Sequence, residues 1–549
     1  MKNKYFLFLN NKPPQRSYGS SSNQQSQSSS LATFLVIIMI KNALILDGYT
    51  DEPAGLGVPP YIGIYPRYAY GVLDKYNVKA DYITIDRFRE LRGDFNLDKY
   101  DAVICICGFH TPGKYLNANP ATLKEFVSIL YKYNGLKILG GPAATKYGSS
   151  MIGGKIEDES KYKSFFDIVV EGDLEAVLND LLREGSVEKI DFNRYRNYEE
   201  LREYAIRGAK VVKLHPNYPY IIAEIETYRG CSRALSGGCS FCTEPRRFGL
   251  PKFRDEKDIV DEIKALYGEG IRYFRIGRQP CIFSYKSIDS EKEEVPKPNV
   301  EAIERLFKGI RNVSNPKVLH IDNANPAVIA RHENESKKIA KILVKYCTSG
   351  NVAAFGVESF DEKVIKANNL LTTPEDVLKA VQILNEIGGK RGGTGLPYLL
   401  PGINLLFGLK GERKETFNIN FEYLKEIYDR GFMLRRINIR QVVPFFGTEI
   451  TIKDIKKAEK RKKLFLWFKE KVREEIDNKM LKRVVPKGTI LKDVFVEVKE
   501  REDLYFGRQF GSYPLLVGIV DKNLKIGKFV DVEVIDYGRR SITGRVAKP

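Results

Sequence analysis

From residue 40 onward the chain repeats one pattern, in which a short apolar run is followed by a longer stretch with apolar residues at helical spacing. Four such runs precede residue 150, namely IKNALILDG, DYITID, DAVICICG and KILGGP. Short apolar runs that alternate with helix-length segments are typical of a parallel sheet covered on both faces by helices. We therefore expect a Rossmann-like domain over residues 40–185, followed by a connector over residues 186–220.

The same alternation starts again at residue 221 and continues to residue 455. Six apolar runs mark the expected strands, namely YIIAEIETYRG, IRYFRIG, KVLHID, NVAAFGVE, INLLFG and RINIRQVV. Six strand–helix units fit an open, partial (β/α)6 barrel. In parallel barrels the residues that carry chemistry lie at the carboxyl ends of the strands, so we expect functional side chains directly after these runs.

The spacing of apolar residues changes in the last part of the chain. A basic helical linker over residues 456–485 leads to the short alternating runs VFVEVKE, LLVGIV, FVDVEVIDYG and SITGRV. Short strands separated by glycine turns indicate a small β-barrel, here over residues 486–549. The predicted fold is thus α/β, with an N-terminal Rossmann-like parallel sheet, a central partial barrel and a C-terminal small β-barrel.

The first 39 residues follow neither pattern. Residues 11–30 are polar and of low complexity, which leaves no means of forming a core. The apolar stretch LATFLVIIMI follows this tract, an order that does not match a secretory signal. We expect residues 1–39 to be disordered or a misassigned extension, with Met39 as the native start.

The net charge and the number and spacing of the cysteines indicate which classes of function are compatible with this chain. Lys and Arg number 89 against 70 Asp and Glu, a formal net charge of +19. This excess favours a polyanionic partner such as RNA, and it also suits a protein from a basic proteome. Seven cysteines are too few for a disulfide framework, and the clustering of three indicates metal binding in a reducing compartment. No apolar run approaches the ~20 residues that span a bilayer, so we expect a cytoplasmic protein with no membrane partner.

The strongest chemical signal is the stretch Cys231-Ser-Arg-Ala-Leu-Ser-Gly-Gly-Cys239-Ser-Phe-Cys242. Thiolates are soft ligands that suit iron–sulfur clusters or zinc. Three cysteines leave one iron of a [4Fe-4S] cluster without a protein ligand, so a small molecule can chelate that iron. A structural zinc site takes four closed ligands, and the nearest further candidate, His215, lies upstream of a predicted strand. We favour the cluster over zinc.

A strand, a three-cysteine loop ending in Cys-x-aromatic-Cys and a helix, together opening a partial barrel, resemble the radical S-adenosylmethionine superfamily over residues 220–450. The resemblance implies a [4Fe-4S] cluster on the catalytic and metal-binding residues Cys231, Cys239 and Cys242, with S-adenosylmethionine on the open iron. In that family one electron, from a donor such as ferredoxin or flavodoxin, cleaves the sulfonium to a 5′-deoxyadenosyl radical, which abstracts hydrogen from the substrate.

Further positions match the family in order along the chain. They follow the cysteine loop or a predicted strand, where the family contacts the adenine, the methionine amine and the ribose. The implied cofactor-binding residues are Phe241, Gly277, Gln279, Glu358, Gly408 and Glu412. The chain departs from the family pattern in two places. Seven residues instead of three separate the first two cysteines, and the second strand lacks the usual Gly-Gly-Glu.

The N-terminal domain resembles the cobalamin-binding domain that precedes many such barrels, through ILGGPAAT and FDIVVEGDLEAVLNDLL. The Asp-x-His-x-x-Gly that supplies an axial histidine elsewhere is absent, so bound cobalamin and a bare scaffold both remain open. Methylthiotransferases carry a three-cysteine auxiliary cluster in the corresponding domain. Only Cys105 and Cys107 occur here, and we favour core packing for both.

The C-terminal module resembles a TRAM domain, the small RNA-binding barrel that ends many tRNA methylthiotransferases. Its cations and aromatics suit phosphate contact and base stacking, although we expect about half of the aromatics to be barrel core; they are Arg508, Arg539, Arg540, Arg545, Tyr505, Phe506, Phe510, Tyr513 and Tyr537. The favoured function is radical modification of RNA, by methylation or sulfur insertion on tRNA. The alternatives are a cobalamin-dependent radical methyltransferase acting on a small molecule or protein, and a non-catalytic metal-containing RNA-binding protein.

Overall fold

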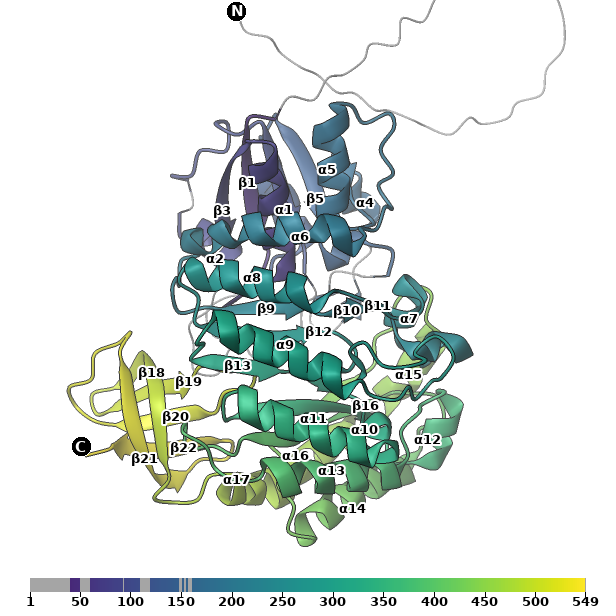
Figure 1. Cartoon of the computed structure of the whole chain (residues 1–549), viewed down its shortest axis with the longest axis vertical. Coiled ribbons are helices and arrows are strands. Elements are labelled where there is room, and N and C mark those ends of the chain that lie inside the picture. The colour runs from purple at the N-terminus through teal and green to yellow at the C-terminus, as the bar shows by residue number, and fades with distance from the viewer. Residues whose placement is uncertain are drawn as a thin grey trace, which may run out of the picture.

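The computed structural model describes residues 40–49, 60–91, 93–108, 119–147, 151–152, 155–156 and 160–548. Three parts follow one another along the chain (Figure 1): a doubly wound sheet, a partial barrel and a closed C-terminal β-barrel. This arrangement confirms the predicted fold class. The expectation for residues 1–39 lies outside the described residues. Within the described ranges, no helix is both long and apolar enough to cross a bilayer.

The N-terminal sheet has the strand order β3-β1-β4-β5-β8, and all neighbouring strands are parallel. Its strands are β1 (Asn42–Asp47), β3 (Lys79–Thr84), β4 (Ala102–Ile106), β5 (Leu136–Gly140) and β8 (Ile168–Val169). Because the first strand lies between the second and the third, the order reverses between β1 and β4. In doubly wound sheets with this flavodoxin-like order, ligands bind beyond the carboxyl ends of the strands at that reversal.

Both faces of this sheet are buried, which explains why its strands read as continuous apolar runs. Alternate residues of β1 enter different cores: Ala43 and Ile45 pack on one face, and Leu44 and Leu46 pack on the other. The helices of this part are α1 (Ile64–Lys75), α2 (Ile85–Glu90), α3 (Leu123–Leu130), α4 (Ser160–Lys163), α5 (Leu174–Glu184) and α6 (Tyr198–Arg207). A short antiparallel pair, β6 (Met151–Ile152) and β7 (Lys155–Ile156), precedes α4.

The central part contains all six predicted strands, in two parallel sheets of order β13-β12-β9-β2 and β14-β15-β16-β17. The strands are β2 (Tyr61–Ile62), β9 (Ile222–Glu226), β12 (Tyr273–Arg278), β13 (Val318–Ile321), β14 (Asn323–Ala324), β15 (Asn351–Glu358), β16 (Leu399–Phe407) and β17 (Arg436–Gln441). Only Asp322 separates β13 from β14, so one continuous run of chain joins the two sheets. The sequence did not predict β2, which comes from the N-terminal part and pairs with β9.

Helices cover the outer side of this partial barrel (Figure 1). They include α8 (Glu256–Gly268), α9 (Val300–Val313), α10 (Pro326–Arg331), α11 (Glu333–Tyr346), α12 (Glu362–Ala367), α13 (Pro374–Gly388) and α14 (Lys414–Asp429). The predicted basic linker is also helical, over α15 (Ile452–Lys460), α16 (Lys462–Val472) and α17 (Asn478–Val484). Phe465 and Phe468 of α16 pack against Phe407 of β16, so the lysines of α16 form the outer face of an amphipathic helix.

The C-terminal barrel closes in the order β18-β19-β20-β22-β21. Its strands are β18 (Ile490–Arg501), β19 (Leu504–Gln509), β20 (Leu516–Val520), β21 (Phe529–Tyr537) and β22 (Ser541–Val546). The long strand β18 pairs antiparallel with both β19 and β21, through irregularities that bend it, and β20 is parallel to β22. This pairing is the strand order of an OB-fold.

An aromatic interface joins the C-terminal barrel to the central one. Phe495, Phe510 and Phe529 form a cluster with Tyr220 and with the first residues of three central strands. Those first residues are Ile222 of β9, Tyr273 of β12 and Val318 of β13. The C-terminal barrel therefore covers the amino ends of these strands, beside the sheet in Figure 1. The carboxyl ends, where barrel enzymes place their chemistry, lie at the opposite end.

Candidate functional site

The three clustered cysteines lie in a loop at the carboxyl end of β9. This loop is closed by the antiparallel pair β10 (Tyr228–Arg229) and β11 (Lys252–Phe253), and the amide of Cys231 donates to the carbonyl of Gly249 at 3.0 Å. The seven-residue insert forms a 3-10 helix over Ser232–Ser236 and then turns at Gly238. Gly238 has a φ of 78°, and a Cβ there would lie 2.5 Å from the ring of Pro245. The long insert is therefore an ordered turn that requires glycine.

Side chains of the short helix α7 (Glu244–Phe248) form hydrogen bonds to the backbone of the cysteine loop. The Nη1 of Arg246 donates to the carbonyl oxygens of Cys239 and Cys242, each at 2.8 Å. The carboxylate of Glu244 accepts a hydrogen bond from the amide of Gly230 at 2.9 Å. These charge-assisted bonds connect both ends of the loop to a single helix.

Two asparagines after α12, which the sequence reasoning missed, connect the cysteine loop to the loop after β16. Asn368 accepts from the hydroxyl of Ser240 at 2.7 Å and donates to the carbonyl of Lys410 at 2.8 Å. Asn369 donates to the carbonyl of Gly238 at 3.0 Å. Their only sequence signal was their position in VIKANN, shortly after Glu358. Side-chain hydrogen bonds thus join the cysteine loop to the loop after β16, two segments that lie far apart in the sequence.

Burial dominates the electrostatics of the three thiols. It raises the pKa of Cys231 to about 12 and also raises the pKa of Cys239 and of Cys242, and the neighbouring Cys239 contributes to the rise at the other two. Buried thiolates therefore need a cationic partner. Within the described ranges, no group of three or more His, Cys, Asp or Glu is arranged to hold a single metal ion. The donor set itself, three soft thiols in one loop, fits an iron–sulfur cluster.

Glu358 ends β15 beside this loop. It has a φ of 65°, burial raises its pKa to about 7 against the opposing charge of Arg440, and its own charge raises the pKa of Cys239. A non-glycine residue held at positive φ marks a locally strained backbone, which often occurs at functional sites. The structure therefore brings two residues selected from sequence, Cys239 and Glu358, into one electrostatic environment.

Phe241 and Gly408 also come together. The half-buried ring of Phe241 packs in a small apolar cluster with Leu409, directly after Gly408. Gly408 has a φ of 89°, and a Cβ there would lie 2.9 Å from Ala458. Its amide donates to the carboxylate of Glu412 at 2.6 Å, and Arg461 lies 3.5 Å from that carboxylate. Glu412 therefore closes the loop that follows β16.

Gly277 and Gln279 lie at the carboxyl end of β12, where the pairing with β9 is irregular. The amide nitrogen of Gln279 donates to the carbonyl of Ile276 at 2.9 Å, and its amide oxygen accepts from Thr227 at 3.4 Å. Asn323 donates to the backbone carbonyl of Gln279 at 3.0 Å. The nitrogen and the oxygen of the Gln279 side-chain amide therefore both form hydrogen bonds to neighbouring residues of the barrel.

Behind the site, a buried group of ion pairs joins the N-terminal domain to the barrel. Arg196 of the connector pairs with Glu175 of α5 and with Glu226 of β9. Arg229 of β10 pairs with Asp173 and with Glu226. All of these side chains are buried, and breaking one such pair leaves an uncompensated charge. The strand that leads into the cysteine loop is therefore tied to the N-terminal domain.

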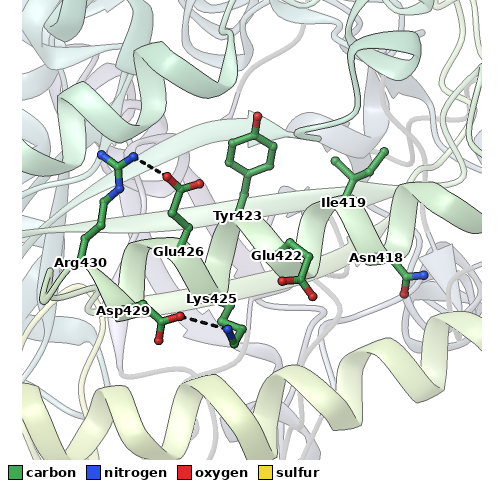
Figure 2. A pocket seen from close by; sticks show the side chains of 8 residues that line it. All are labelled: Asn418, Ile419, Glu422, Tyr423, Lys425, Glu426, Asp429 and Arg430. Atoms are coloured by element: carbon green, nitrogen blue, oxygen red, sulfur yellow. Dashed lines mark hydrogen bonds and ion pairs between the residues drawn. The ribbon is translucent and has the colours of Figure 1, made fainter.

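A separate hollow lies on the outer face of α14 (Figure 2), lined by Asn418, Ile419, Glu422, Tyr423, Lys425, Glu426, Asp429 and Arg430. Its charged side chains pair within the helix, Lys425 with Asp429 and Arg430 with Glu426. It contributes no residue to the cysteine loop.

Most of the cations and aromatics singled out in the C-terminal barrel make intramolecular contacts. Arg508 is buried and pairs with Glu497, Arg545 pairs with Glu533, and Arg539 pairs with Glu470 and Glu474. Tyr505 is buried in the barrel core and Phe510 in the interface between the barrels. Arg539, Arg540 and Arg545 remain exposed to solvent. Further exposed cations lie at or near the strand ends, namely Lys499, Arg501, Lys522, Lys525 and Lys528.

A partial parallel barrel with a three-cysteine loop at its carboxyl end defines the class of radical S-adenosylmethionine enzymes. The chain belongs to the Radical SAM superfamily, which matches residues 225–405. It is therefore an enzyme whose cofactors are a [4Fe-4S] cluster and S-adenosylmethionine.

The chain is also similar to other proteins over much of its length. The uncharacterized protein MJ0274 of Methanocaldococcus jannaschii is 91% identical over 519 residues, covering 94% of this chain and 96% of that protein. The ribosomal protein uS12 methylthiotransferase RimO of Clostridioides difficile is 21% identical over 335 residues, covering 60% of this chain and 67% of RimO. The radical methyltransferase TsrM of Kitasatospora setae aligns with a TM-score of 0.49 and 14% identity, over 76% of each chain.

Proposed function

We propose that this enzyme forms the 5′-deoxyadenosyl radical at a cluster held by Cys231, Cys239 and Cys242, and that it modifies RNA, by methylation or sulfur insertion on tRNA. The observation that carries the proposal is that three half-buried cysteines share one loop at the carboxyl end of the barrel. Glu358, at the end of β15, is near enough for its charge to act on Cys239. The bound cluster would supply the electron and the open iron that cleave S-adenosylmethionine. A ferredoxin or flavodoxin would supply that electron.

The residues of the chain would then hold and orient S-adenosylmethionine. Phe241, beside Leu409, offers an apolar face for the adenine, and the Gly408 loop, closed by Glu412, shapes the same side. Glu358 offers a carboxylate to the ribose. Gly277 and the internally bonded Gln279 form the wall where the methionine part would lie.

The support for RNA comes from the C-terminal barrel. Its strand order is that of the OB-fold, in which strands 2 and 3 and the loops beside them bind oligonucleotides. Lys522, Lys525 and Lys528 are exposed beside β20, and within the described part of the chain none of them forms an ion pair. The formal net charge of +19 adds to this attraction.

One experiment tests the radical chemistry. After anaerobic purification and reconstitution with iron and sulfide, wild type should release 5′-deoxyadenosine from S-adenosylmethionine under reducing conditions, and the triple variant Cys231→Ala, Cys239→Ala, Cys242→Ala should not. Equal release from both proteins would refute ligation by these cysteines. Absence of release from wild type would refute the activity.

A second experiment tests the RNA substrate. Exchange of Lys522, Lys525 and Lys528 for Glu should weaken binding of bulk tRNA by at least about ten-fold at low salt, because fewer counterions are released. The matched control exchanges three exposed lysines of α11, Lys338, Lys341 and Lys345, for Glu. Equal affinity for tRNA in both triple variants would argue against this surface.

A cobalamin-dependent methyl transfer is the second candidate, favoured by the N-terminal domain. The carboxyl edge of its sheet faces the catalytic barrel, since Tyr147, after β5, lies 6.3 Å between ring centroids from Phe446, after β17. Ligands of doubly wound sheets bind at this edge. A corrinoid absorption spectrum in the protein purified from a cobalamin-fed host would support this candidate. Superfamily membership removes the non-catalytic alternative.

A further inference from the structure

The interior of the partial barrel holds arginines that its carboxylates do not neutralise. Arg275 of β12 pairs with Asp322, and it lies 4.0 Å from Glu224 of β9. Arg436 and Arg440 stand on β17, and because they are four residues apart on a strand they share one face. Within the described part of the chain, neither of these two arginines has a carboxylate at ion-pair distance.

Arg436 lies deep in this interior. Its guanidinium stacks over the ring of Tyr513 at 4.0 Å from the centroid, and among the described residues it donates no hydrogen bond. Burial lowers the pKa of Arg436, and the charges of Arg440 and Arg275 act in the same direction, whereas Tyr513 and Asp322 oppose the decrease. Five donor N–H groups are thus available on a partly desolvated cation.

Arg440 lies nearer to the carboxyl end of the barrel. Its charge acts on the carboxylate of Glu358, which in turn acts on Cys239. Between the two arginines along β17, Asn438 reaches Asn404 of β16, with 3.2 Å between their side-chain amides. Arg436, Asn438 and Arg440 therefore form a row of polar side chains on one face of β17.

The C-terminal barrel closes this interior at the amino ends of the strands. The loop between β19 and β20 inserts Tyr513, whose hydroxyl donates to Asp322 and whose carbonyl accepts from Arg435. The amide of Ser512 donates to Nδ1 of His320 at 3.3 Å. A ligand in the interior would therefore enter from the carboxyl end, beside the cysteine loop.

We propose that Arg436 and Arg440 bind an anionic group of the substrate, a carboxylate or a phosphate, inside the barrel, with Tyr513 limiting how deep it lies. Guanidinium groups pair with both anions through two parallel hydrogen bonds, and a bound anion would offset the repulsion between the two arginines. The role of this group as part of a substrate rests on the proposed function. Anion binding itself does not.

The test uses the full reconstituted chain and two probes, inorganic phosphate and malonate, with binding measured by calorimetry. We expect wild type to bind phosphate or malonate, and Arg436→Gln and Arg440→Gln each to weaken that binding at least about ten-fold, as loss of a charge-assisted hydrogen bond implies. Arg436→Lys should recover part of the affinity. Arg430→Gln, at the outer end of α14, is the matched control and should bind as wild type.

The preferred probe distinguishes a phosphate-bearing substrate from a carboxylate-bearing one. The proposal is overturned when wild type binds neither probe, or when both glutamine variants bind as wild type does. Arg440 is exposed, so Arg440→Gln remains informative where Arg436→Gln fails to fold. Anion binding without 5′-deoxyadenosine release would preserve this subsite and refute the proposed function, whereas release without anion binding would do the opposite.

Discussion

The hydroxyl of Tyr513 donates a hydrogen bond to Asp322, which joins the C-terminal barrel to the interior of the catalytic barrel. Asp322 also pairs with Arg275, so a single carboxylate serves both a strand of the catalytic barrel and the inserted loop. The ring of Tyr513 lies under Arg436. The C-terminal barrel therefore forms part of the wall around the interior of the central barrel.

This contact should contribute measurably to stability. Tyr513→Phe removes one hydrogen bond to a charged acceptor and should lower the free energy of unfolding by about 1–2 kcal/mol. Asp322→Ala also leaves the Arg275 charge without its nearest partner, and it should cost more. Urea unfolding measures both, with Tyr131→Phe, an exposed residue on the N-terminal domain, as the control. Equal stability of Tyr513→Phe and Tyr131→Phe would contradict the contact.

Each cluster ligand should be individually necessary. Cys231→Ser, Cys239→Ser and Cys242→Ser should each lose the iron and sulfide retained by wild type after reconstitution and desalting, because hydroxyls are poor ligands for this soft site. Cys347→Ser is the control, since Cys347 is buried away from the loop. Iron and sulfide analysis with the visible absorption spectrum measures the outcome. Iron content in Cys239→Ser that equals the Cys347→Ser control would exclude Cys239 as a ligand.

The hydrogen bond from the Gly408 amide to the Glu412 carboxylate should increase the affinity for S-adenosylmethionine. Glu412→Ala leaves the Gly408 amide without its acceptor and Arg461 without its carboxylate, so the dissociation constant should rise about ten-fold, as for loss of one such bond. Glu412→Gln keeps an acceptor and should have a smaller effect. Equilibrium dialysis on reconstituted protein measures this, with Glu415→Gln on α14 as the control. Unchanged affinity in a folded Glu412→Ala protein would show that the loop does not shape this site.

Lowering the pH should decrease the free energy of unfolding through protonation of His320, which lies between the two barrels. Burial lowers the pKa of this imidazole to about 4, and Arg435 and Arg275 add to the decrease, so the folded state holds it neutral. The unfolded chain takes up the proton near pH 6.5, so this contribution to stability is complete above about pH 6.5 and is lost as the pH falls toward 4. The total loss at this site is about 3 kcal/mol.

Unfolding free energies measured from pH 7 to pH 4 would test this expectation. His320→Asn should flatten the decrease over that range. His215, whose pKa burial lowers to about 3, should account for a similar share, and His215→Asn measures it separately. The same slope in wild type and His320→Asn would contradict the assignment.

Local pattern alone predicted much of this architecture. Strands β9, β12, β13, β15, β16 and β17 all coincide with predicted runs. In β15 and β16 most positions are buried and apolar, as expected for strands covered on both faces. In β17 the pattern alternates, with Ile437 and Ile439 in the hydrophobic core. The cysteine loop was predicted because three thiols within twelve residues are typical of a shared metal or iron–sulfur site. Gly238 and Gly408, at positive φ, occupy places where only glycine fits easily.

The sequence by itself determined the three-part fold, the cysteine loop and the class of chemistry, because those depend on periodicity and on donor type over short stretches. Tertiary structure alone decided that Tyr513 reaches Asp322, 191 residues away, and that Arg508 turns inward to Glu497 instead of toward solvent. It also decided that β2 joins the catalytic sheet. Alternation along a strand shows that two faces differ, but which face is covered, and by which distant partner, depends on how separately folded elements pack.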